Sequence, residues 1–299
     1  MKTLVFGEIL WDVIEGREYL GGAPLNFAAH ITKCGSNATI VSAVGDDNRG
    51  WRAIQEITKL KVNHAAVNIF AGIPTGIVDV MLNQGQPTYH IEENVAYDFI
   101  NLEQTLPELL KLQPFDVFYF GTLAQRASKS REALNELLKA MPFKHIFYDV
   151  NLRKDAYSPD VIRNSLRRST IFKLNTEEVT VISNLLFKTT LSMENFCRYI
   201  SDEFPVSLII ITAGEQGCHV YVNNSLVSLP GVPIKVVDAV GAGDAFSAAF
   251  MAHYYNTSNA VAAARIANRV GSFVAGMPGP IPEYSNELKQ ELLQRLPTT

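Results

Sequence analysis

From residue 115 onward, short apolar segments alternate with longer segments whose apolar residues recur every three or four positions. The short segments have the length and composition of buried strands, and the longer ones have the period of amphipathic helices. In chain order, the pattern predicts strands at 115–120, 145–150, 170–174 and 207–212 and helices at 128–140, 159–168, 176–186 and 191–203. Such alternation predicts an α/β fold built as a doubly wound, mostly parallel sheet with helices on both faces.

The two ends of the chain extend this pattern. Expected elements are strands at 3–9 and 40–44, helices at 24–35 and 51–60, a hairpin of 218–222 and 226–229, and helices at 260–275 and 286–296. Pro24 near the start and Gly35 at the end are typical helix boundaries. The Asn223-Asn224 pair favours the turn of the hairpin.

Two segments do not fit the alternation. Residues 13–22 are too long for a tight connection between a strand and a helix, and residues 72–91 alternate with period two around a break at Gln84-Gly-Gln-Pro. We expect a small sheet outside the main layers, although an ordinary edge hairpin would give the same pattern. Without repeats or linkers, the chain is predicted to be one domain, 1–299, with a lid formed by about 13–22 and 72–98 inserted in it.

Composition limits the possible partners and the compartment. With 26 Lys+Arg against 30 Asp+Glu, dispersed along the chain, nucleic acid is not an expected partner. Glu8 and Asp12 interrupt any signal-like apolar stretch, and no apolar run approaches spanning length, so we expect no membrane partner and a cytoplasmic protein. Cys34, Cys197 and Cys218 lack the spacing of a zinc site or a disulfide framework and are expected to be buried thiols.

The stretch 238–250 has the character of an anion site. It follows the apolar run 234–237, which we interpret as a strand, and it leads into a helical pattern. Gly241 and Gly243 allow a tight turn, so the unpaired amides of the first helical turn can hold a phosphate. Asp244 either complements the helix dipole or handles a hydroxyl group that attacks the phosphate, and the residues alone leave both interpretations open.

Polar residues follow most of the predicted strands, where ligands bind in open parallel sheets. They are Asp12, Asn151, Arg153, Asn175, Glu178, Thr212, Gly214 and Gly217. Each has a structural alternative. Asn175 and Glu178 have the spacing of a capping box, and they equally suit a magnesium ion held through its waters.

The remaining residues at the strand ends also have both a structural and a functional interpretation. Thr212 and its glycines form either a plain turn or a phosphate nest, and Arg153 either a surface ion pair or an anion contact. Asp12 is either a loop cap or a grip on sugar hydroxyls. His30 and His219 fit packing roles.

Common nucleotide motifs are absent from the sequence. No Gly-x-x-x-x-Gly-Lys-Ser/Thr occurs, and no Gly-x-Gly-x-x-Gly follows the first strand. A P-loop site is therefore excluded, and a nicotinamide-dependent oxidoreductase is disfavoured.

Two long motifs in the right order resemble the ribokinase-like (pfkB) carbohydrate kinases. They are Gly21-Gly-Ala-Pro-Leu-Asn-Phe-Ala-Ala near the N-terminus and Asp238-Ala-Val-Gly-Ala-Gly-Asp-Ala-Phe near the C-terminus. The similarity runs essentially the full chain, and Gly-Glu-Ile-Leu-Trp-Asp12, Leu123-Ala-Gln-Arg126 and Asp149-x-Asn-Leu-Arg153 are most similar to bacterial fructokinases. The resemblance implies the ribokinase-like fold, with the small sheet as a lid that often also pairs two subunits, so a homodimer through the lid is an expectation.

The resemblance also implies roles for individual residues. Asp244 would be the catalytic base, with the anion hole at Gly241, Ala242 and Gly243 and Arg153 near the transferred phosphoryl group. The sugar would contact Asp12, Gly22, Asn26, Asn151, Arg153 and Asp244, with Tyr97 closing over it; the nucleotide site would be lined by Asn175, Thr212, Gly214, Gly217, Gly241, Gly243 and Asn268.

Two ions complete the implied site. Asn175 and Glu178 would order Mg²⁺, and Asp238 with the Val240 carbonyl would hold a monovalent cation, K⁺. Ala239 stands where the family usually has Thr, which places the details of that cation loop in question.

The resemblance implies an ATP-dependent kinase that phosphorylates a primary hydroxyl of a free sugar, with fructose to fructose 6-phosphate as the preferred reaction. A 2-keto-3-deoxygluconate kinase, for which Arg126 could bind the carboxylate, and a nucleoside kinase are the alternatives within the family. A non-catalytic sugar sensor on the same scaffold is disfavoured by the intact Asp244 and the Asn175/Glu178 pair.

Overall fold

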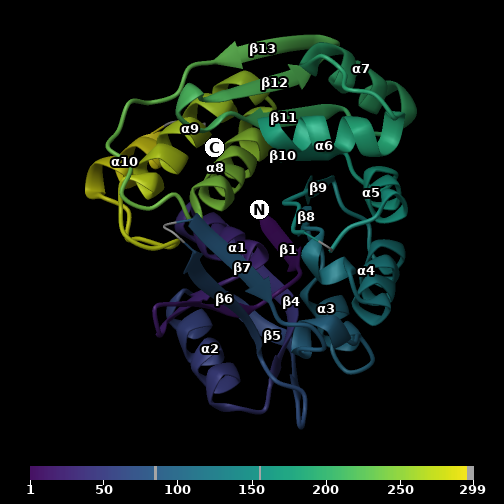
Figure 1. Cartoon of the computed structure of the whole chain (residues 1–299), viewed down its shortest axis with the longest axis vertical. Coiled ribbons are helices and arrows are strands. Elements are labelled where there is room, and N and C mark those ends of the chain that lie inside the picture. The colour runs from purple at the N-terminus through teal and green to yellow at the C-terminus, as the bar shows by residue number, and fades with distance from the viewer. Residues whose placement is uncertain (84–85, 155, 295–299) are drawn as a thin grey trace.

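The computed structural model describes residues 1–83, 86–154 and 156–294, which form two sheets and their surrounding helices (Figure 1). The strands are β1 (Lys2–Phe6), β2 (Leu10–Ile14), β3 (Arg17–Gly21), β4 (Asn37–Gly45), β5 (Asn63–Phe70), β6 (Gly76–Asn83), β7 (Gln86–Ile91), β8 (Val117–Phe120), β9 (His145–Asp149), β10 (Ile171–Asn175), β11 (Leu208–Thr212), β12 (Cys218–Val222) and β13 (Ser225–Leu229). The α-helices are α1 (Ala23–Lys33), α2 (Asn48–Lys59), α3 (Leu106–Leu112), α4 (Ser128–Ala140), α5 (Pro159–Leu166), α6 (Thr176–Phe187), α7 (Met193–Glu203), α8 (Ala242–Thr257), α9 (Ala260–Ala275) and α10 (Asn286–Gln294).

The larger sheet has nine strands in the order β13-β12-β11-β10-β9-β8-β1-β4-β5. The seven strands from β11 to β5 are parallel, and β12 and β13 extend the sheet as an antiparallel hairpin. Asn223 and Asn224 at its turn both have positive φ, which asparagine tolerates better than most residues. This arrangement confirms the predicted doubly wound, mostly parallel sheet.

Each face of this sheet packs against its own layer of helices (Figure 1). Because side chains alternate along a strand, Leu4 and Phe6 of β1 enter one core and Val5 enters the other. The first core includes buried residues of α3 to α7, and the second includes those of α1, α2, α8, α9 and α10. Helices on both faces explain why the central strands are mostly apolar, with the buried pair Lys173 and Asp149 as an exception.

The smaller sheet has the order β3-β2-β6-β7. Strand β2 pairs antiparallel with β3 and parallel with β6, and β6 pairs antiparallel with β7. A small sheet outside the main layers is therefore present, and its β6–β7 pair is the hairpin expected at 72–91. The break predicted at Gln84-Gly-Gln-Pro falls at residues 84–85, outside the described residues.

The order of the strands marks where a ligand would bind. From β1 the chain adds β4 and β5 on one side and then returns to place β8, β9, β10 and β11 on the other side. The sheet order therefore reverses between β1 and β8. In open α/β sheets, ligands bind in the crevice at the carboxyl ends of the strands beside such a reversal.

Two expectations about local structure were wrong. The run 234–237, interpreted as a strand, is irregular, and Val236 and Val237 are 57% and 58% exposed. β-branched residues favour strands, but no strand among the described residues pairs with this run, and its Val237 amide bonds instead to Ala275 at the end of α9. Asp12 lies inside β2 of the small sheet, not in a loop after the first strand, because β1 already ends at Phe6.

The packing expected for the remaining side chains is found in part, since His219 is half-buried on β12 with Nδ1 2.8 Å from Ser228 Oγ. His30 is buried between Tyr284 OH (2.7 Å) and the Pro280 carbonyl (2.8 Å). The thiols of Cys197 and Cys218 are buried, and Cys34 is half-buried.

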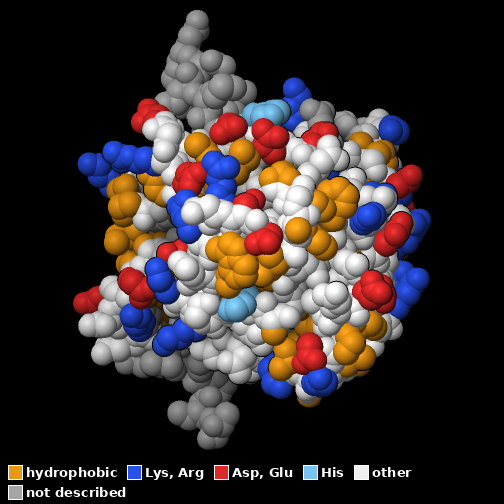
Figure 2. Space-filling model, turned by 90° about the horizontal axis from the view of Figure 1, so that it is seen from below, with side chains coloured by type: hydrophobic (Ala, Val, Ile, Leu, Met, Phe, Trp, Pro, Cys, Tyr) orange, Lys and Arg blue, Asp and Glu red, His pale blue; other side chains and the backbone are white. Residues whose placement is uncertain are grey.

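The surface carries mixed charges. On the face shown in Figure 2, acidic and basic side chains are interspersed with apolar ones and not separated by sign. Within the described ranges, no helix is both long and apolar enough to cross a membrane.

Candidate active site

Helix α8 begins at the carboxyl edge of the large sheet with Gly241 as its N-cap residue. Gly241 has φ 77°, and a Cβ at this position would lie 2.5 Å from the Pro280 carbonyl oxygen. Glycine is therefore required both by the backbone conformation and by the close approach. The Ala242 amide donates to the Ala239 carbonyl at 3.3 Å, and the first intrahelical bond is that of the Ala245 amide to the Gly241 carbonyl. The amides of Gly243 and Asp244 therefore have no acceptor four residues earlier within the helix.

Asp244, in the first turn of α8, is buried and accepts a hydrogen bond of 2.9 Å from Nδ2 of Asn26. The two residues lie 218 positions apart in the sequence and meet because α1 packs against α8. Burial raises the pKa of Asp244 to about 6, and the Asp149 charge adds to the rise, whereas Lys173, Asn26 and Arg153 oppose it. A carboxyl group with such a pKa can take up a proton near neutral pH.

The loop after β1 and the start of α1 meet beside Asp244. Gly22 has φ 107°, and a Cβ there would lie 2.4 Å from the Glu8 carbonyl oxygen. Asn26 donates its backbone amide to the Gly22 carbonyl at 2.9 Å. In the part of the chain that the structure describes, Glu8 Oε2, Asn26 Oδ1 and Tyr97 OH are buried without a hydrogen-bond partner. Glu8 was not among the predicted site residues.

Asp12 and Arg153 extend the site toward the small sheet. Burial raises the pKa of Asp12 to about 6, and the Arg153 charge opposes this rise. Arg153 is exposed. Burial also raises the pKa of Glu8, to about 7, and that of Asp244, and the charge of Arg153 opposes the rise in each of the three carboxyl groups. Asn151, two residues earlier, has φ 44°, a conformation that non-glycine residues adopt mostly at constrained positions.

A buried ion pair lies behind the start of α8. Lys173 of β10 donates to both oxygens of Asp149 at the end of β9, at 3.0 and 3.1 Å. Tyr119 OH and Ser247 Oγ also donate to Asp149, at 3.1 and 3.0 Å. Burial disfavours the Lys173 ammonium, but Asp149, Asp244 and Glu178 together raise its pKa.

The ammonium of this pair also reaches the helix start, since a Cβ on Gly243 would lie 3.3 Å from Lys173 Nζ. The sequence analysis assigned no role to Lys173 or Asp149. A lysine inside the apolar strand Ile-Phe-Lys-Leu was the available signal, because buried lysines are rare unless paired.

Asn175 and Glu178 form the predicted capping box at the start of α6. Asn175 Oδ1 accepts from the Glu178 amide, and Glu178 Oε2 accepts from the Asn175 amide, both at 2.8 Å. Glu178 Oε1 accepts from the Leu152 amide at 2.7 Å. Burial raises the pKa of Glu178, while Lys173 opposes the rise. Each carboxylate oxygen keeps a further lone pair, so the donor set fits a magnesium ion held through water.

The candidate nucleotide turn follows β11, beside the capping box, since Thr212 pairs with Asn175 across the sheet. The 3-10 turn η3 (Gly214–Gln216) is closed by the Ala213 amide, which donates to the Gly217 carbonyl at 2.8 Å. Asn268 of α9 lies behind this turn and donates to the Pro230 carbonyl at 3.2 Å. The structure therefore gathers these four predicted residues, Thr212, Gly214, Gly217 and Asn268, around one corner of the sheet.

The predicted cation loop immediately precedes α8. Asp238 Oδ1 accepts from the Val240 amide at 3.0 Å, and Oδ2 accepts from the Gly279 amide at 3.1 Å. Its carboxylate thus ties the loop to residues after α9. The exposed apolar side chains of this loop are Ile234, Val236, Val237 and Val240.

Tyr97 and Arg126 lie together near the small sheet. Tyr97, on the 3-10 turn η1 (Ala96–Phe99), is fully buried with its ring against Gly76, and the Arg126 guanidinium carbon lies 5.0 Å from the ring centre. Arg126 forms a bidentate ion pair with Asp98 at 2.8 Å for both contacts and also donates to the Glu92 carbonyl. Its guanidinium is therefore largely engaged within the protein.

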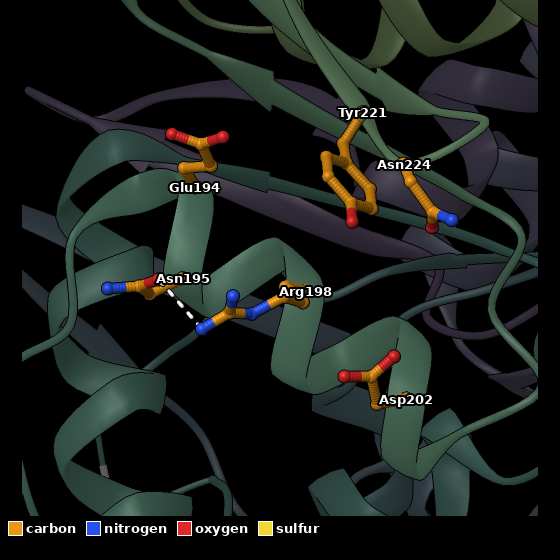
Figure 3. A pocket seen from close by; sticks show the side chains of 6 residues that line it. All are labelled: Glu194, Asn195, Arg198, Asp202, Tyr221 and Asn224. Atoms are coloured by element: carbon orange, nitrogen blue, oxygen red, sulfur yellow. Dashed lines mark hydrogen bonds between the residues drawn. The ribbon is translucent and has the colours of Figure 1, made fainter.

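A surface pocket elsewhere in the fold contains none of these residues. Glu194, Asn195, Arg198 and Asp202 of α7 face Tyr221 and Asn224 of the β12–β13 hairpin (Figure 3). Arg198 donates to Asn195 at 3.2 Å. Asn224 follows Val222, which pairs with Leu208 at the start of β11, so this end of the pocket lies at the amino edge of the sheet, away from the candidate site.

Comparison with known proteins agrees with this geometry. The model of the pfkB family carbohydrate kinases matches residues 2–286. The sugar kinase PH1459 of Pyrococcus horikoshii is 28% identical over 263 residues, which cover 82% of this chain and 80% of that protein. The fructokinase of Salmonella typhimurium is 25% identical over 267 residues, 84% of this chain and 83% of that protein.

Solved structures show the same fold. The crystal structure of PH1459, described as an uncharacterized sugar kinase, superposes with a TM-score of 0.82 at 26% identity and covers 98% of this chain and 97% of that one. The fructokinase of Xylella fastidiosa with bound ATP gives a TM-score of 0.86 at 18% identity, with 98% of each chain covered.

The two-sheet architecture is thus that of the ribokinase-fold kinases, with its candidate residues at the carboxyl edge of the large sheet. The chain belongs to the pfkB family of carbohydrate kinases and is accordingly an ATP-dependent sugar kinase.

Proposed function

We propose that this kinase transfers the γ-phosphoryl group of ATP to a primary hydroxyl of a free, uncharged sugar, with the 6-hydroxyl of fructose as the preferred acceptor. The observation that carries the proposal is the buried Asp244 carboxyl at the start of α8, held by Asn26 and with a pKa raised by burial to about 6. Such a group orients the acceptor hydroxyl and takes its proton as the oxygen–phosphorus bond forms. ADP leaves with the bridging oxygen.

Negative charge on the transferred phosphoryl group would be stabilised by hydrogen-bond donors and positive charge of the protein itself. The transition state of phosphoryl transfer is loose, so positioning and charge stabilisation matter more than a strong base. The amides at Gly241, Ala242 and Gly243, the helix dipole of α8 and Arg153 would supply this stabilisation, and the Ala242 amide would have to exchange its 3.3 Å contact with the Ala239 carbonyl for the phosphate. Mg²⁺, held through water by Asn175 and Glu178, would neutralise part of the charge on the phosphates.

The nucleotide is assigned to the corner formed by Thr212, Gly214, Gly217 and Asn268. The exposed apolar side chains between 234 and 240 adjoin the start of α8 and offer a surface on which a nucleotide base could pack. Burying apolar area there would explain why this run stays exposed in the free protein.

The acceptor is assigned to the pocket formed by Asp12, Gly22, Asn26, Asn151 and Tyr97, beside Asp244. Three carboxyl groups, those of Glu8, Asp12 and Asp244, surround it and face one arginine, Arg153. A surplus of carboxyl groups favours a neutral polyol over a sugar acid. Arg126, the residue considered for a sugar-acid carboxylate, is already paired with Asp98, which also favours the neutral acceptor.

Three further assignments belong to the same proposal. The chain acts as one domain in which the small sheet forms a lid over the acceptor, and Asp12 moves with this lid because it lies in β2. Two chains would pair through the lid, where β3 is an edge strand. Asp238 and the Val240 carbonyl would hold K⁺, and the free thiols suit the reducing cytoplasm, where ATP and free sugars meet.

Coupled ADP release tests the proposal. The purified protein is assayed with ATP and Mg²⁺ on fructose, tagatose, ribose, 2-keto-3-deoxygluconate and adenosine, with K⁺ and with tetramethylammonium in its place. We expect sugar- and magnesium-dependent ADP release that is greatest with fructose. Turnover confined to 2-keto-3-deoxygluconate or adenosine would refute the proposed acceptor while leaving the kinase intact.

A further inference from the structure

Glu8 is a buried carboxyl group beside Gly22, one of the residues assigned to the acceptor. It lies in the loop that leaves β1 at the point where the sheet order reverses, and it is 5% exposed. Its Oε2 atom has no hydrogen-bond partner among the described residues. A buried carboxylate oxygen without a donor is costly, so proteins retain it mainly where a ligand supplies the donor.

The surroundings of Glu8 place its carboxyl group between the two sides of the pocket. Its Cγ atom lies 3.4 Å from the position that a Cβ of Gly22 would occupy. Burial raises the pKa of Glu8 to about 7; the Asp244 charge adds to this rise and the Arg153 charge opposes it. The charge of Glu8 in turn contributes to the raised pKa of Tyr97. Glu8 therefore lies within electrostatic reach of Asp244 on one side and of Tyr97, beside the small sheet, on the other.

Two other unpartnered atoms lie in the same region. Asn26 uses Nδ2 to bind Asp244, which leaves its Oδ1 buried and unpaired, and Tyr97 OH is likewise buried and unpaired in the described chain. One acceptor atom on Glu8, one on Asn26 and a hydroxyl on Tyr97 match the donors and acceptors of a polyhydroxylated ligand.

We propose that Glu8 is a specificity-determining residue of the acceptor site: its Oε2 accepts a hydrogen bond from a sugar hydroxyl, and in its ionised form the carboxylate selects uncharged sugars against sugar acids. The inference rests on the proposed function and deepens it. Asp12, Asp244 and Glu8 together repel an acceptor carboxylate, and Glu8, unlike Asp244, takes no part in the proposed proton transfer.

A purely structural role for Glu8 makes a different prediction. The backbone amides of Glu8 and Ala23 both lower the pKa of this carboxyl, so Glu8 also supports the start of α1. Glutamine keeps an oxygen for those amides but loses the charge. Glu8→Gln therefore separates the two roles.

The experiment compares steady-state kinetics of the wild type, Glu8→Gln and Glu8→Asp on fructose and on 2-keto-3-deoxygluconate. We expect Glu8→Gln to raise KM for fructose about tenfold or more, the loss typical of a hydrogen bond to a charged group, with kcat changed much less. The preference for fructose over the sugar acid, as a ratio of kcat/KM values, should fall about tenfold. Glu8→Asp keeps the charge, but its shorter side chain moves the carboxylate oxygen away from the sugar hydroxyl. KM for fructose should therefore rise, while the preference for fructose over the sugar acid remains.

Thermal unfolding supplies a second measurement that does not depend on turnover. Fructose should raise Tm of the wild type and raise that of Glu8→Gln less at the same concentration. The exposed Glu132→Gln on α4 is the matched control and should behave as the wild type.

The outcomes are distinct. Unchanged KM and unchanged preference in Glu8→Gln would overturn the inference while the wild type still phosphorylates fructose. Absence of sugar-dependent ADP release from the wild type would overturn the proposed function and this inference together. Should Glu8→Gln fail to fold, Glu8→Asp carries the test, and a wild-type KM in that variant refutes the hydrogen bond.

Discussion

Lys173 Nζ contacts both carboxylate oxygens of Asp149, at 3.0 and 3.1 Å, and the pair is buried directly behind the glycine turn that begins α8. The two residues come from adjacent parallel strands, β10 and β9, and face each other in register. This ion pair places a fixed positive charge beneath the candidate phosphate site. The same charge lowers the pKa of Asp244, which would otherwise rise further through burial.

Removing this charge should affect both stability and the pH dependence of catalysis. Lys173→Met leaves the buried Asp149 with the hydroxyl donors of Tyr119 and Ser247 but without its counter-charge, so we expect a loss of about 3 kcal/mol in the free energy of unfolding. Asp244 would bind its proton more tightly, so the acid limb of kcat/KM, which we expect near pH 6 in the wild type from the pKa of Asp244, should move to higher pH.

Urea unfolding and a pH series of kcat/KM measure these two effects. The exposed Lys139→Met on α4 is the control. The double variant Asp149→Asn/Lys173→Met should recover part of the lost stability, because no buried charge of this pair is left alone. An acid limb that stays in place in Lys173→Met would contradict the electrostatic link to Asp244.

Asp244→Asn should separate catalysis from stability. Without the carboxylate, kcat should fall by a factor of at least about 100, the low end of general-base contributions, while ADP still binds. The pKa of Asp244 is raised from 3.8 to about 6, so its folded-state stabilisation is complete below pH 4 and is lost as pH rises through 6. Above pH 6, the ionised Asp244 lowers the free energy of unfolding by up to about 3 kcal/mol, whereas a neutral Asn at this position carries no such penalty.

We therefore expect Asp244→Asn to be at least as stable as the wild type at pH 8. Urea unfolding at pH 8, ADP calorimetry and turnover on fructose are the measurements. Turnover near the wild-type rate, with the fold and ADP binding intact, would remove Asp244 as the base.

Gly241→Ala should damage the anion site through the backbone. Its φ of 77° disfavours any Cβ, and this Cβ would meet the Pro280 carbonyl oxygen at 2.5 Å, so the turn must shift. We expect a loss of about 1–3 kcal/mol in unfolding free energy and a clear fall in kcat. Gly35→Ala is the matched control, because Gly35 has φ 85° but a Cβ added there would have no atom within 4 Å.

Thermal unfolding and kcat of the two variants give the comparison. Gly35→Ala should show only the conformational cost of about 1 kcal/mol and normal kcat. Equal losses of stability in both variants, with kcat unchanged in Gly241→Ala, would mean that the Pro280 contact does not shape the site.

Much of the fold was predictable because it is encoded over short distances. Helices α4 and α9 and strand β12 have the expected bounds, since amphipathic period, caps and apolar runs depend on residues a few positions apart. The reciprocal Asn175–Glu178 contacts were predicted on the same ground. Strand β5 (Asn63–Phe70) was not predicted, because its alternation is interrupted by polar residues on a half-exposed edge.

The candidate site was predicted through its motifs, but Glu8, Asp149 and Lys173 were given no role in it. Glu8 and Asp149 stand inside quoted motifs, and Lys173 was considered only as part of an apolar strand. The role of each depends on its neighbours in the fold. Glu8 lies near other buried polar atoms without a hydrogen-bond partner, and Lys173 faces the carboxylate of Asp149 on the neighbouring strand.

Local spacing along the amino-acid sequence was enough to specify most of the strands and helices and the glycine turn of α8, and the resemblance of two motifs to the pfkB family indicated a kinase. Which side chains meet depends on the tertiary structure: Asn26 with Asp244 across 218 residues, Lys173 with Asp149, and Glu8 with the acceptor pocket. The tertiary structure also left the β-branched run 234–237 outside the sheet. Strand pairing and burial depend on neighbours that the whole fold brings together. A segment with high strand propensity therefore stays outside a sheet when the topology places no partner strand beside it.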